Sequence, residues 1–451
     1  MKKRDHPERH DDAAKIPATF LQAGAAQFWL AVLGIGISTG IGAAALTKFL
    51  EFIQHAAWSG SGLHIVAAAE GASPWRHVLV LLGAGAVVGI GQFVLGRLSV
   101  GNGIDITAAI WFSAGRLPIV RTLGSAVLSV ITVAMGASLG REGAPKQAGA
   151  VFANMFSDRE RLSDEQRKLL VACGAGAGMA AAYGVPLGGA LFAIEVMRGV
   201  LALRLILPAL LASLTATAIS WIFLPDAPTY QIPSFASTWG SFGLALTIGP
   251  LAGVVSVGFV RAVAWAERNR PTGWERFVLP LGVLGVLGVV SIEFPQILGN
   301  GSDLCQMLFA GGVTSWVVLV PLLLLKPCAT VMCLRSGTPG GLFTPSLTLG
   351  ALLGGTAGYV VMQFLPETSL ALCALLGAGS VVAATTQGPI SAVVLVMELT
   401  GRDRSFIAPL LLAVSLATLV SRTIEPRSIY DARLTDEEIK ARLAARQPSP
   451  H

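Results

Sequence analysis

The feature that most restricts this fold is a series of long apolar runs. FWLAVLGIGISTGIGAAALTKFL, HVLVLLGAGAVVGIGQFVLG and LALCALLGAGSVVAATTQGPISAVVLVMEL are three of them. They approach or exceed the roughly 20 residues that carry a helix across a bilayer, and we expect about ten such segments in all. Only 13% of the residues are charged, whereas soluble domains carry about 25%. The chain is therefore predicted to be an all-α, polytopic integral membrane protein.

Much of the charge lies in the tails and loops of the chain. The net charge is +6, and many of the charged residues lie in MKKRDHPERH, DRERLSDEQRK and RLTDEEIKARLAAR. Acidic and basic residues alternate there, which is typical of cytoplasmic loops and not of a nucleic-acid-binding patch. We expect both termini to be cytoplasmic, no nucleic-acid partner, and, since the tails are short, a prokaryotic inner (plasma) membrane.

The sequence contains no pattern that indicates enzyme chemistry or a bound cofactor. No Ser–His–Asp set, metal-ligand cluster or phosphate-binding loop is present, so an enzyme is a remote alternative, and no metal or cofactor is expected. The cysteines are odd in number and lie in apolar context without metal-ligand spacing. They are predicted to be buried packing residues: Cys173, Cys305, Cys328, Cys333 and Cys373.

The two halves of the chain share a pattern of small residues, proline and glutamate. At one constant offset, Gly174, Ala175, Gly176, Ala180, Ala181, Pro186 and Glu195 match Gly377, Ala378, Gly379, Ala383, Ala384, Pro389 and Glu398; at a nearly equal offset, Gly140 and Gly149 match Gly341 and Gly350. Such duplication is typical of transporters. Chance similarity of Gly- and Ala-rich helices is the alternative.

This repeat divides the chain without a linker. We expect a cytoplasmic tail over 1–26 and one membrane domain over 27–421, with repeat halves at about 27–225 and 240–421. We expect a short C-terminal segment, 422–451, that contains Tyr430 and no appended regulatory domain.

Three short stretches place glycine at a turn before a potential helix: GNGID (101–105), GREGA (140–144) and GLFTP (341–345). Glycine lets a ligand approach the main chain, and a helix that starts there exposes unpaired N–H groups with partial positive charge. Helix ends of this kind bind anions. Three of them converging in the membrane would form an anion site without a buried full positive charge.

These stretches resemble the signature motifs GSGIP, GREGP and GxFxP of the CLC chloride channels and proton-coupled antiporters. SGTPGGLFTPSLTLG, AAAYGVPLGGALFAIEVMR and IYDARL also resemble CLC segments, and the similarity covers roughly residues 30–435. The resemblance implies a CLC-type inverted-repeat fold with broken, tilted helices. It also implies a homodimer with one anion path in each subunit.

Glu142 matches the family's external gate, a carboxylate that occupies an anion site until protonation releases it. Burial disfavours a charged carboxylate whereas helix N-termini stabilise it, so protonation and anion binding would compete for one place. The alternative is a structural ion pair with Arg141, although adjacent residues on a helix do not face each other. The resemblance also places Arg141 and Gly143 at the anion site.

Asn102 occupies the position of the family's usual central serine, and Gly103 and Ile104 complete that turn. Asn at this place, with proline absent from both GNGID and GREGA, resembles the fluoride-exporting, proton-coupled subgroup (CLC-F type). A carboxamide offers N–H donors with a different reach from that of a hydroxyl. Neutral replacement of serine in a chloride carrier is the alternative.

Leu342 and Phe343 match positions whose backbone N–H groups contact the anion, and Tyr430 matches a tyrosine that closes the inner side of the path. Leu342 and Phe343 could instead form an ordinary helix start. Tyr430 could be an anchor at the membrane–water interface.

Val196 stands where chloride/proton antiporters of the family carry a proton-relaying glutamate. The valine argues against that class, but the fluoride-exporting subgroup also lacks this glutamate. Glu195 and Glu398 are predicted to brace helices through backbone or cationic partners such as Lys326. Asp105 is predicted to cap the helix that follows it.

The leading interpretation is a secondary antiporter that exports fluoride in exchange for protons through a path gated by Glu142. Its partners would be fluoride, protons and membrane lipid. A passive chloride channel and a chloride/proton antiporter are the alternatives.

Overall fold

The computed structural model describes residues 16–17, 22, 24–59, 64–99, 105–234, 239–312, 315–364, 368–401, 406–434 and 437–440. This part of the chain is helical and has no named strand, which confirms the predicted all-α class. Its elements are α1 Ala25–Trp58, α2 Ile65–Glu70, α3 Pro74–Leu98, α4 Ile106–Phe112, α5 Ile119–Ala134, α6 Gly143–Arg159, α7 Asp164–Tyr183, α8 Pro186–Leu191, η2 Phe192–Arg198, α9 Leu203–Ser220, α10 Trp239–Arg268, α11 Glu275–Glu293, η3 Pro295–Ile297, α12 Ser302–Phe309, α13 Trp316–Arg335, α14 Phe343–Met362, α15 Leu370–Thr386, α16 Pro389–Thr400, α17 Ile407–Ile424 and η5 Asp431–Arg433.

Eight of the described helices are long and apolar enough to cross a bilayer: α1, α3, α9, α10, α11, α13, α14 and α17. Helices α5, α15 and α16 are apolar but shorter. The apolar run that begins at Leu370 forms two helices, because Gln387 takes a left-handed conformation (φ 61°) and Pro389 opens α16. Proline lacks an N–H and cannot continue the preceding helix.

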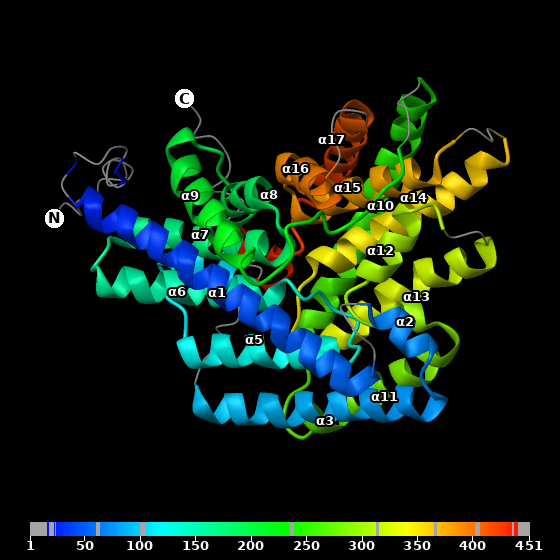
Figure 1. The fold of residues 1–451 in the computed structure, drawn as a ribbon, viewed down its shortest axis with the longest axis horizontal. Helices are drawn as coiled ribbons and strands as arrows, with labels where there is room; N and C mark the ends of the chain where they lie inside the picture. Colours follow the sequence, from blue (N-terminus) through cyan, green and yellow to red (C-terminus); the bar gives the residue numbers. More distant parts are fainter. Residues whose placement is uncertain are drawn as a thin grey trace, which may run out of the picture.

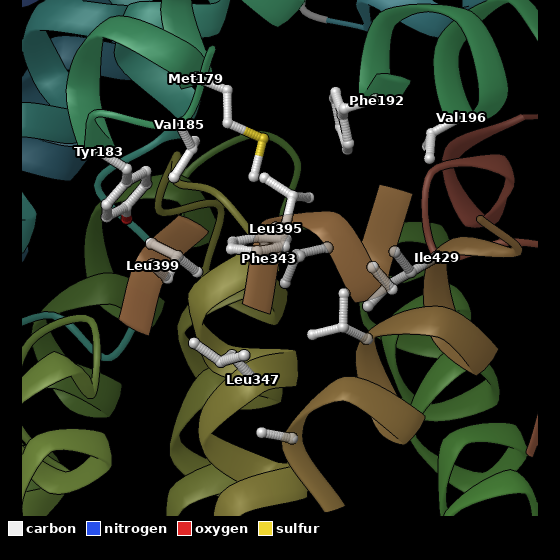
Figure 2. Packing of buried hydrophobic residues seen from close by; sticks show 14 of the residues in the cluster. Met179, Tyr183, Val185, Phe192, Val196, Phe343, Leu347, Leu395, Leu399 and Ile429 are labelled. Carbon is white, nitrogen blue, oxygen red and sulfur yellow. The ribbon is translucent and has the colours of Figure 1, made fainter. Parts of the chain in front are cut away.

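The helices of the two halves lie on different sides of the molecule (Figure 1). Helices α1 and α5 to α9 lie together on one side, and α12 to α17 lie on the other. Helices α3 and α11 run side by side along one edge and bring the halves into contact there. Between the halves, buried apolar side chains from α7, η2, α14 and α16 pack together, among them Tyr183, Phe343 and Leu395 (Figure 2).

Two glycine pairs allow close helix contacts at matching places in the halves. Helix α6 meets α7 at Gly149 and Gly174, and α14 meets α15 at Gly350 and Gly377. A Cβ on any of these glycines would overlap the carbonyl oxygen of its partner. Small residues of this kind let membrane helices approach closely. The glycine match between the halves therefore has a packing cause.

Four of the five cysteines are buried, as predicted, but Cys328 is exposed. Its helix, α13, buries only part of its surface in the protein. The prediction of burial is wrong for Cys328, because an apolar side chain on a spanning helix can face lipid as well as the core.

Glu195 and Glu398 each cap the start of a helix in the other half of the protein. Glu398, near the end of α16, accepts the backbone N–H groups of Leu187 (3.0 Å) and Gly188 (2.6 Å) at the start of α8. Glu195, in η2, accepts the backbone N–H groups of Ile390 (3.1 Å) and of the next residue (2.6 Å) at the start of α16. Helix starts leave N–H groups unsatisfied, and a carboxylate there also suits the helix dipole. The predicted bracing through backbone partners is confirmed.

Lys326 has a different function from the one predicted. Lys326 is a buried residue of α13. Its Nζ donates to the carbonyl oxygens of Ile297 (2.8 Å), Leu298 (3.2 Å) and Gly299 (2.9 Å). The prediction that Lys326 partners Glu195 or Glu398 is wrong, because its ammonium binds these carbonyl groups. An ammonium with three donors can satisfy a chain turn that presents three carbonyl groups.

Replacing Glu398 by alanine should destabilise the protein. The change leaves the N–H groups of Leu187 and Gly188 without their carboxylate, at a cost of about 1–3 kcal/mol. Thermal unfolding in detergent measures the effect as a lower Tm. Glu275→Ala, at the exposed start of α11, is the matched control. An unchanged Tm for Glu398→Ala would contradict the bracing function.

Candidate functional site

The two glycine turns GREGA and GLFTP are joined by a pair of backbone hydrogen bonds. Gly140 donates to the Gly341 carbonyl oxygen and Gly341 donates to that of Gly140, both at 2.8 Å. Helix α6 starts three residues after Gly140, and α14 starts two residues after Gly341. A Cβ on Gly143 would lie 2.9 Å from the Gly341 nitrogen. The turns thus meet directly, and glycine makes the approach possible.

The carboxylate of Glu142 lies in a closed seat formed by α14 and α7. Glu142 is 0% exposed. Its Oε1 accepts the backbone N–H of Phe343 at 2.8 Å, and its Oε2 accepts the hydroxyl groups of Thr344 at 3.0 Å and Tyr183 at 3.3 Å. The two hydroxyl oxygens are 2.8 Å apart. Three neutral donors therefore hold the carboxylate.

Glycine is required at the walls of this seat. A Cβ on Gly341 or on Gly140 would overlap the Glu142 carboxyl group. The Glu142 carboxylate therefore occupies the space that side chains at these two positions would take. The predicted importance of the glycines is consistent with this geometry, and its cause is the volume of the Glu142 side chain.

The donors of the seat are of the kind that bind anions. The Phe343 N–H is at the first residue of α14, where backbone donors have no partner within the helix and the helix dipole is positive. Hydroxyl groups add donors without a fixed charge. Leu342 is the N-cap residue and is buried, and the backbone hydrogen bond to the carboxylate comes from Phe343.

Arg141 lies over the ring of Tyr183 and does not pair with Glu142. Its guanidinium carbon is 4.9 Å from the centre of the Tyr183 ring. Arg141 and Tyr183 line a cavity of about 250 Å³, which also contains Glu51, His64 and Asp303. Among the ion pairs of the described residues, none joins Arg141 to Glu142. The ion-pair interpretation of Glu142 is not supported.

Tyr430 is half-buried and lies in the segment that follows α17. The neighbouring Ile429 N–H donates to the Thr385 carbonyl oxygen at 2.7 Å. The ring of Tyr430 packs edge-on against Phe192, with centroids 5.7 Å apart, and its hydroxyl accepts from Lys146 Nζ at 3.4 Å. These contacts with η2 and α6 favour a place on the path over the alternative of an interface anchor.

Some predicted residues lie elsewhere. Asn102, Gly103 and Ile104 are outside the described residues. Asp105, next in the chain, accepts the backbone N–H groups of Thr107 (2.7 Å) and Ala108 (3.3 Å), so the predicted helix cap is confirmed. Val196 is buried and stands near Phe192 and Ile429 in Figure 2.

Sequence reasoning missed three side chains at the site: Tyr183, Thr344 and Lys146. Each lies inside a stretch that the motif comparison covered. Tyr183 is the one hydroxyl in AAAYGV, Thr344 adjoins Phe343, and Lys146 follows Glu142 by one helical turn. That spacing was the available signal for Lys146.

The fold and the site together define a multi-pass membrane protein with a buried carboxylate on a helix N-terminus at the junction of two halves. The model of the family described as voltage gated chloride channel matches residues 84–422. The chain belongs to this family, the CLC family of anion channels and transporters, which confirms the resemblance inferred from the motifs.

Curated relatives are similar over most of their length. A putative chloride channel protein ClcB-like from Ralstonia nicotianae is 31% identical over 86% of this chain and 93% of its own. The voltage-gated ClC-type chloride channel ClcB of Escherichia coli is 31% identical over 81% of this chain and 88% of its own.

Two solved structures share the fold. A slow cyanobacterial Cl⁻/H⁺ antiporter has a TM-score of 0.80 at 21% identity and covers 92% of this chain and 99% of its own. A CLC-type fluoride/proton antiporter has a TM-score of 0.75 at 23% identity, with the same coverage. Both structures support the CLC-type fold, and neither identifies the anion.

Replacing Tyr183 by phenylalanine should make anion flux less dependent on pH. The change removes a hydroxyl donor from Glu142 and leaves the ring, so the carboxylate is held less firmly and an anion displaces it more often at neutral pH. Halide efflux from proteoliposomes over a range of pH measures this. Tyr359→Phe, further along α14, is the control. A wild-type pH profile for Tyr183→Phe would show that the hydroxyl does not hold the gate.

Proposed function

We propose that this protein is a proton-linked halide transporter in which Glu142 is the gate. The observation that carries the proposal is the buried seat of its carboxylate, formed by the Phe343 N–H and the hydroxyl groups of Thr344 and Tyr183. The same donors can bind a halide once the carboxylate leaves. The site is therefore an anion site with a protonatable occupant.

Competition for the seat couples the two ions. A charged Glu142 accepts three hydrogen bonds there, and protonation removes the charge that these donors stabilise. The neutral side chain then moves toward the cavity that contains Arg141, and a halide takes its place. Return of the carboxylate expels the halide and releases the proton. The same site is thus occupied in turn by the Glu142 carboxylate and by a halide.

Val196 limits the inner half of the proton route. It is a buried valine, so this position offers no carboxylate to relay a proton. A passive channel is the second candidate function, and both Val196 and the names of the curated ClcB relatives favour it. In a channel, Glu142 would open and close the path without net proton transfer.

The anion that we propose is fluoride, exported in exchange for protons. The support is Asn102 in GNGID and the absence of proline from GNGID and GREGA. Chloride is the alternative anion, because the curated relatives are named as chloride channels. We further propose that the protein works as a homodimer in a bacterial inner membrane, with both termini in the cytoplasm.

Efflux from proteoliposomes loaded with fluoride or chloride, with anion and pH electrodes read together, tests the proposal. Fluoride efflux that exceeds chloride efflux and is accompanied by proton uptake is the expected result. Chloride efflux with an unchanged pH would instead support the passive channel.

Replacing Glu142 by glutamine should abolish proton movement and leave anion flux passive. Glutamine fills the same volume but cannot carry a proton or a charge. The same efflux experiment measures the proton flux. Glu51→Gln, which removes a carboxylate that lines the cavity beside Arg141, is the control. Retained pH-driven anion pumping in Glu142→Gln would exclude the gating function.

Replacing Asn102 by serine should lower the ratio of fluoride to chloride efflux. The shorter hydroxyl donor would return the turn to the form common in chloride carriers. Efflux of each anion under equal gradients measures the ratio. If it does not change, selectivity depends on other residues.

A further inference from the structure

A cavity far from the Glu142 seat is lined by α11 and α13. Helix α11 lies along an edge of the molecule and contacts α13 (Figure 1). Together the two helices line a cavity of about 550 Å³, which falls within the about 300–1,000 Å³ of small-molecule sites. None of its lining residues lines the cavity beside Arg141 or holds the Glu142 carboxylate. The cavity is therefore separate from the anion site.

The α11 wall of this cavity is an apolar stripe that follows the helical repeat. Its residues are Val278, Leu279, Gly282, Val283 and Val286. Positions three and four apart lie on one side of a helix, so the stripe is about 12 Å long. Met332, which is exposed, lines the cavity from α13. Because α11 is long and apolar enough to span a bilayer, this stripe faces hydrocarbon chains.

One end of the cavity carries aromatic and charged residues. Trp274 precedes the first residue of α11 and is 72% exposed, and Arg335 is the last residue of α13. Tryptophan is enriched at the membrane–water interface. An arginine at a helix C-terminus also suits the helix dipole. This end of the cavity thus lies at the level of the lipid head groups, and the stripe extends from it into the hydrocarbon region.

Two side chains of opposite charge line the cavity: Arg335 and Glu275. The Nη1 atom of Arg335 is buried and has no hydrogen-bond partner among the described residues. A buried donor without a partner is costly, more so in a charged group. The ion pairs of the described residues include neither Arg335 nor Glu275. The two charges therefore do not neutralise each other, and a ligand with both signs of charge would suit them.

We propose that this cavity binds phosphatidylethanolamine, with an acyl chain along the α11 stripe, the lipid phosphate on Arg335 and the lipid ammonium on Glu275. A guanidinium donates two parallel hydrogen bonds to phosphate oxygens. A primary ammonium has three N–H donors for a carboxylate. Phosphatidylglycerol has no cation for Glu275, and the quaternary ammonium of phosphatidylcholine has no N–H to donate. Phosphatidylethanolamine alone among these three lipids matches both side chains.

Gly282 leaves room for the acyl chain in the middle of the stripe. A Cβ on Gly282 would meet no atom within 4 Å outside the backbone of its own helix. Glycine in a helix interior is less favourable than alanine, and no neighbouring atom of the described residues requires it here. An acyl chain that packs against the bare backbone accounts for the missing side chain. A larger residue at this position would fill the cavity and displace no protein atom.

Native mass spectrometry of the full-length protein, titrated in detergent with palmitoyl-oleoyl lipids, tests the site. The Kd of the first bound lipid should be about threefold or more lower for phosphatidylethanolamine than for phosphatidylglycerol or phosphatidylcholine. Arg335→Met removes the phosphate ligand and should weaken the Kd of phosphatidylethanolamine about tenfold or more. Arg97→Met, in the last turn of α3, is the matched control and should leave this Kd unchanged.

Replacing Glu275 by glutamine tests the head-group assignment. The carboxylate that receives the lipid ammonium is lost, so phosphatidylethanolamine and phosphatidylglycerol should bind with equal Kd. Without added lipid, Glu275→Gln should keep the wild-type Tm. Glu293→Gln, at the other end of α11, should preserve the lipid preference. A preference for phosphatidylethanolamine that persists in Glu275→Gln would reject the assigned head group.

Replacing Gly282 by leucine tests the acyl-chain stripe and decides the matter if Arg335→Met does not fold. Leucine favours the helix and fills the cavity, so the Kd of phosphatidylethanolamine should weaken about fivefold or more. Gly258→Leu is the matched control, because a Cβ on Gly258 of α10 also meets no atom within 4 Å. A wild-type Kd in Arg335→Met or in Gly282→Leu would overturn the proposal, and so would equal Kd values for the three lipids in the unmodified protein.

Discussion

Two hydrogen bonds between Gly140 and Gly341 are the contact on which the site depends. They join the starts of α6 and α14, which come from different halves of the chain. Because each glycine both donates and accepts, the two turns are fixed in one register. That register places the Glu142 carboxylate on the first N–H of α14. A shift of either turn would remove the carboxylate from its donors.

Main-chain N–H and carbonyl groups stabilise several ionisable side chains of the helical core. Glu195 and Glu398 accept N–H groups at helix starts, and Lys326 donates to the carbonyl groups of a turn. Glu142 also lies on a helix start, where the Phe343 N–H and two hydroxyl groups donate to its carboxylate. Lys146 lies against two aromatic rings and donates to the Tyr430 hydroxyl.

Much of the fold could be predicted from the sequence, because apolar length, glycine turns and the internal repeat are local or periodic signals. Glu142 and Phe343 were identified from their motifs. The hydroxyl of Tyr183 and the ring of Phe192 were not, since their relation to α6 exists only after three helices pack. The break at Gln387 was also missed, because its backbone conformation depends on Pro389 and on tertiary contacts. Composition alone does not separate one long span from two short helices.

The reciprocal capping by Glu195 and Glu398 has a consequence for how the chain is made. Helix α8, in the first half, obtains its N-terminal partner from the end of α16, and α16 obtains its own from η2. During synthesis, α8 leaves the ribosome before Glu398, and the chain between them would span hundreds of ångströms if extended. During that interval α8 starts with unsatisfied donors in an apolar environment. The caps of α8 and α16 are therefore both formed only when α16 has taken its place beside α8 and η2.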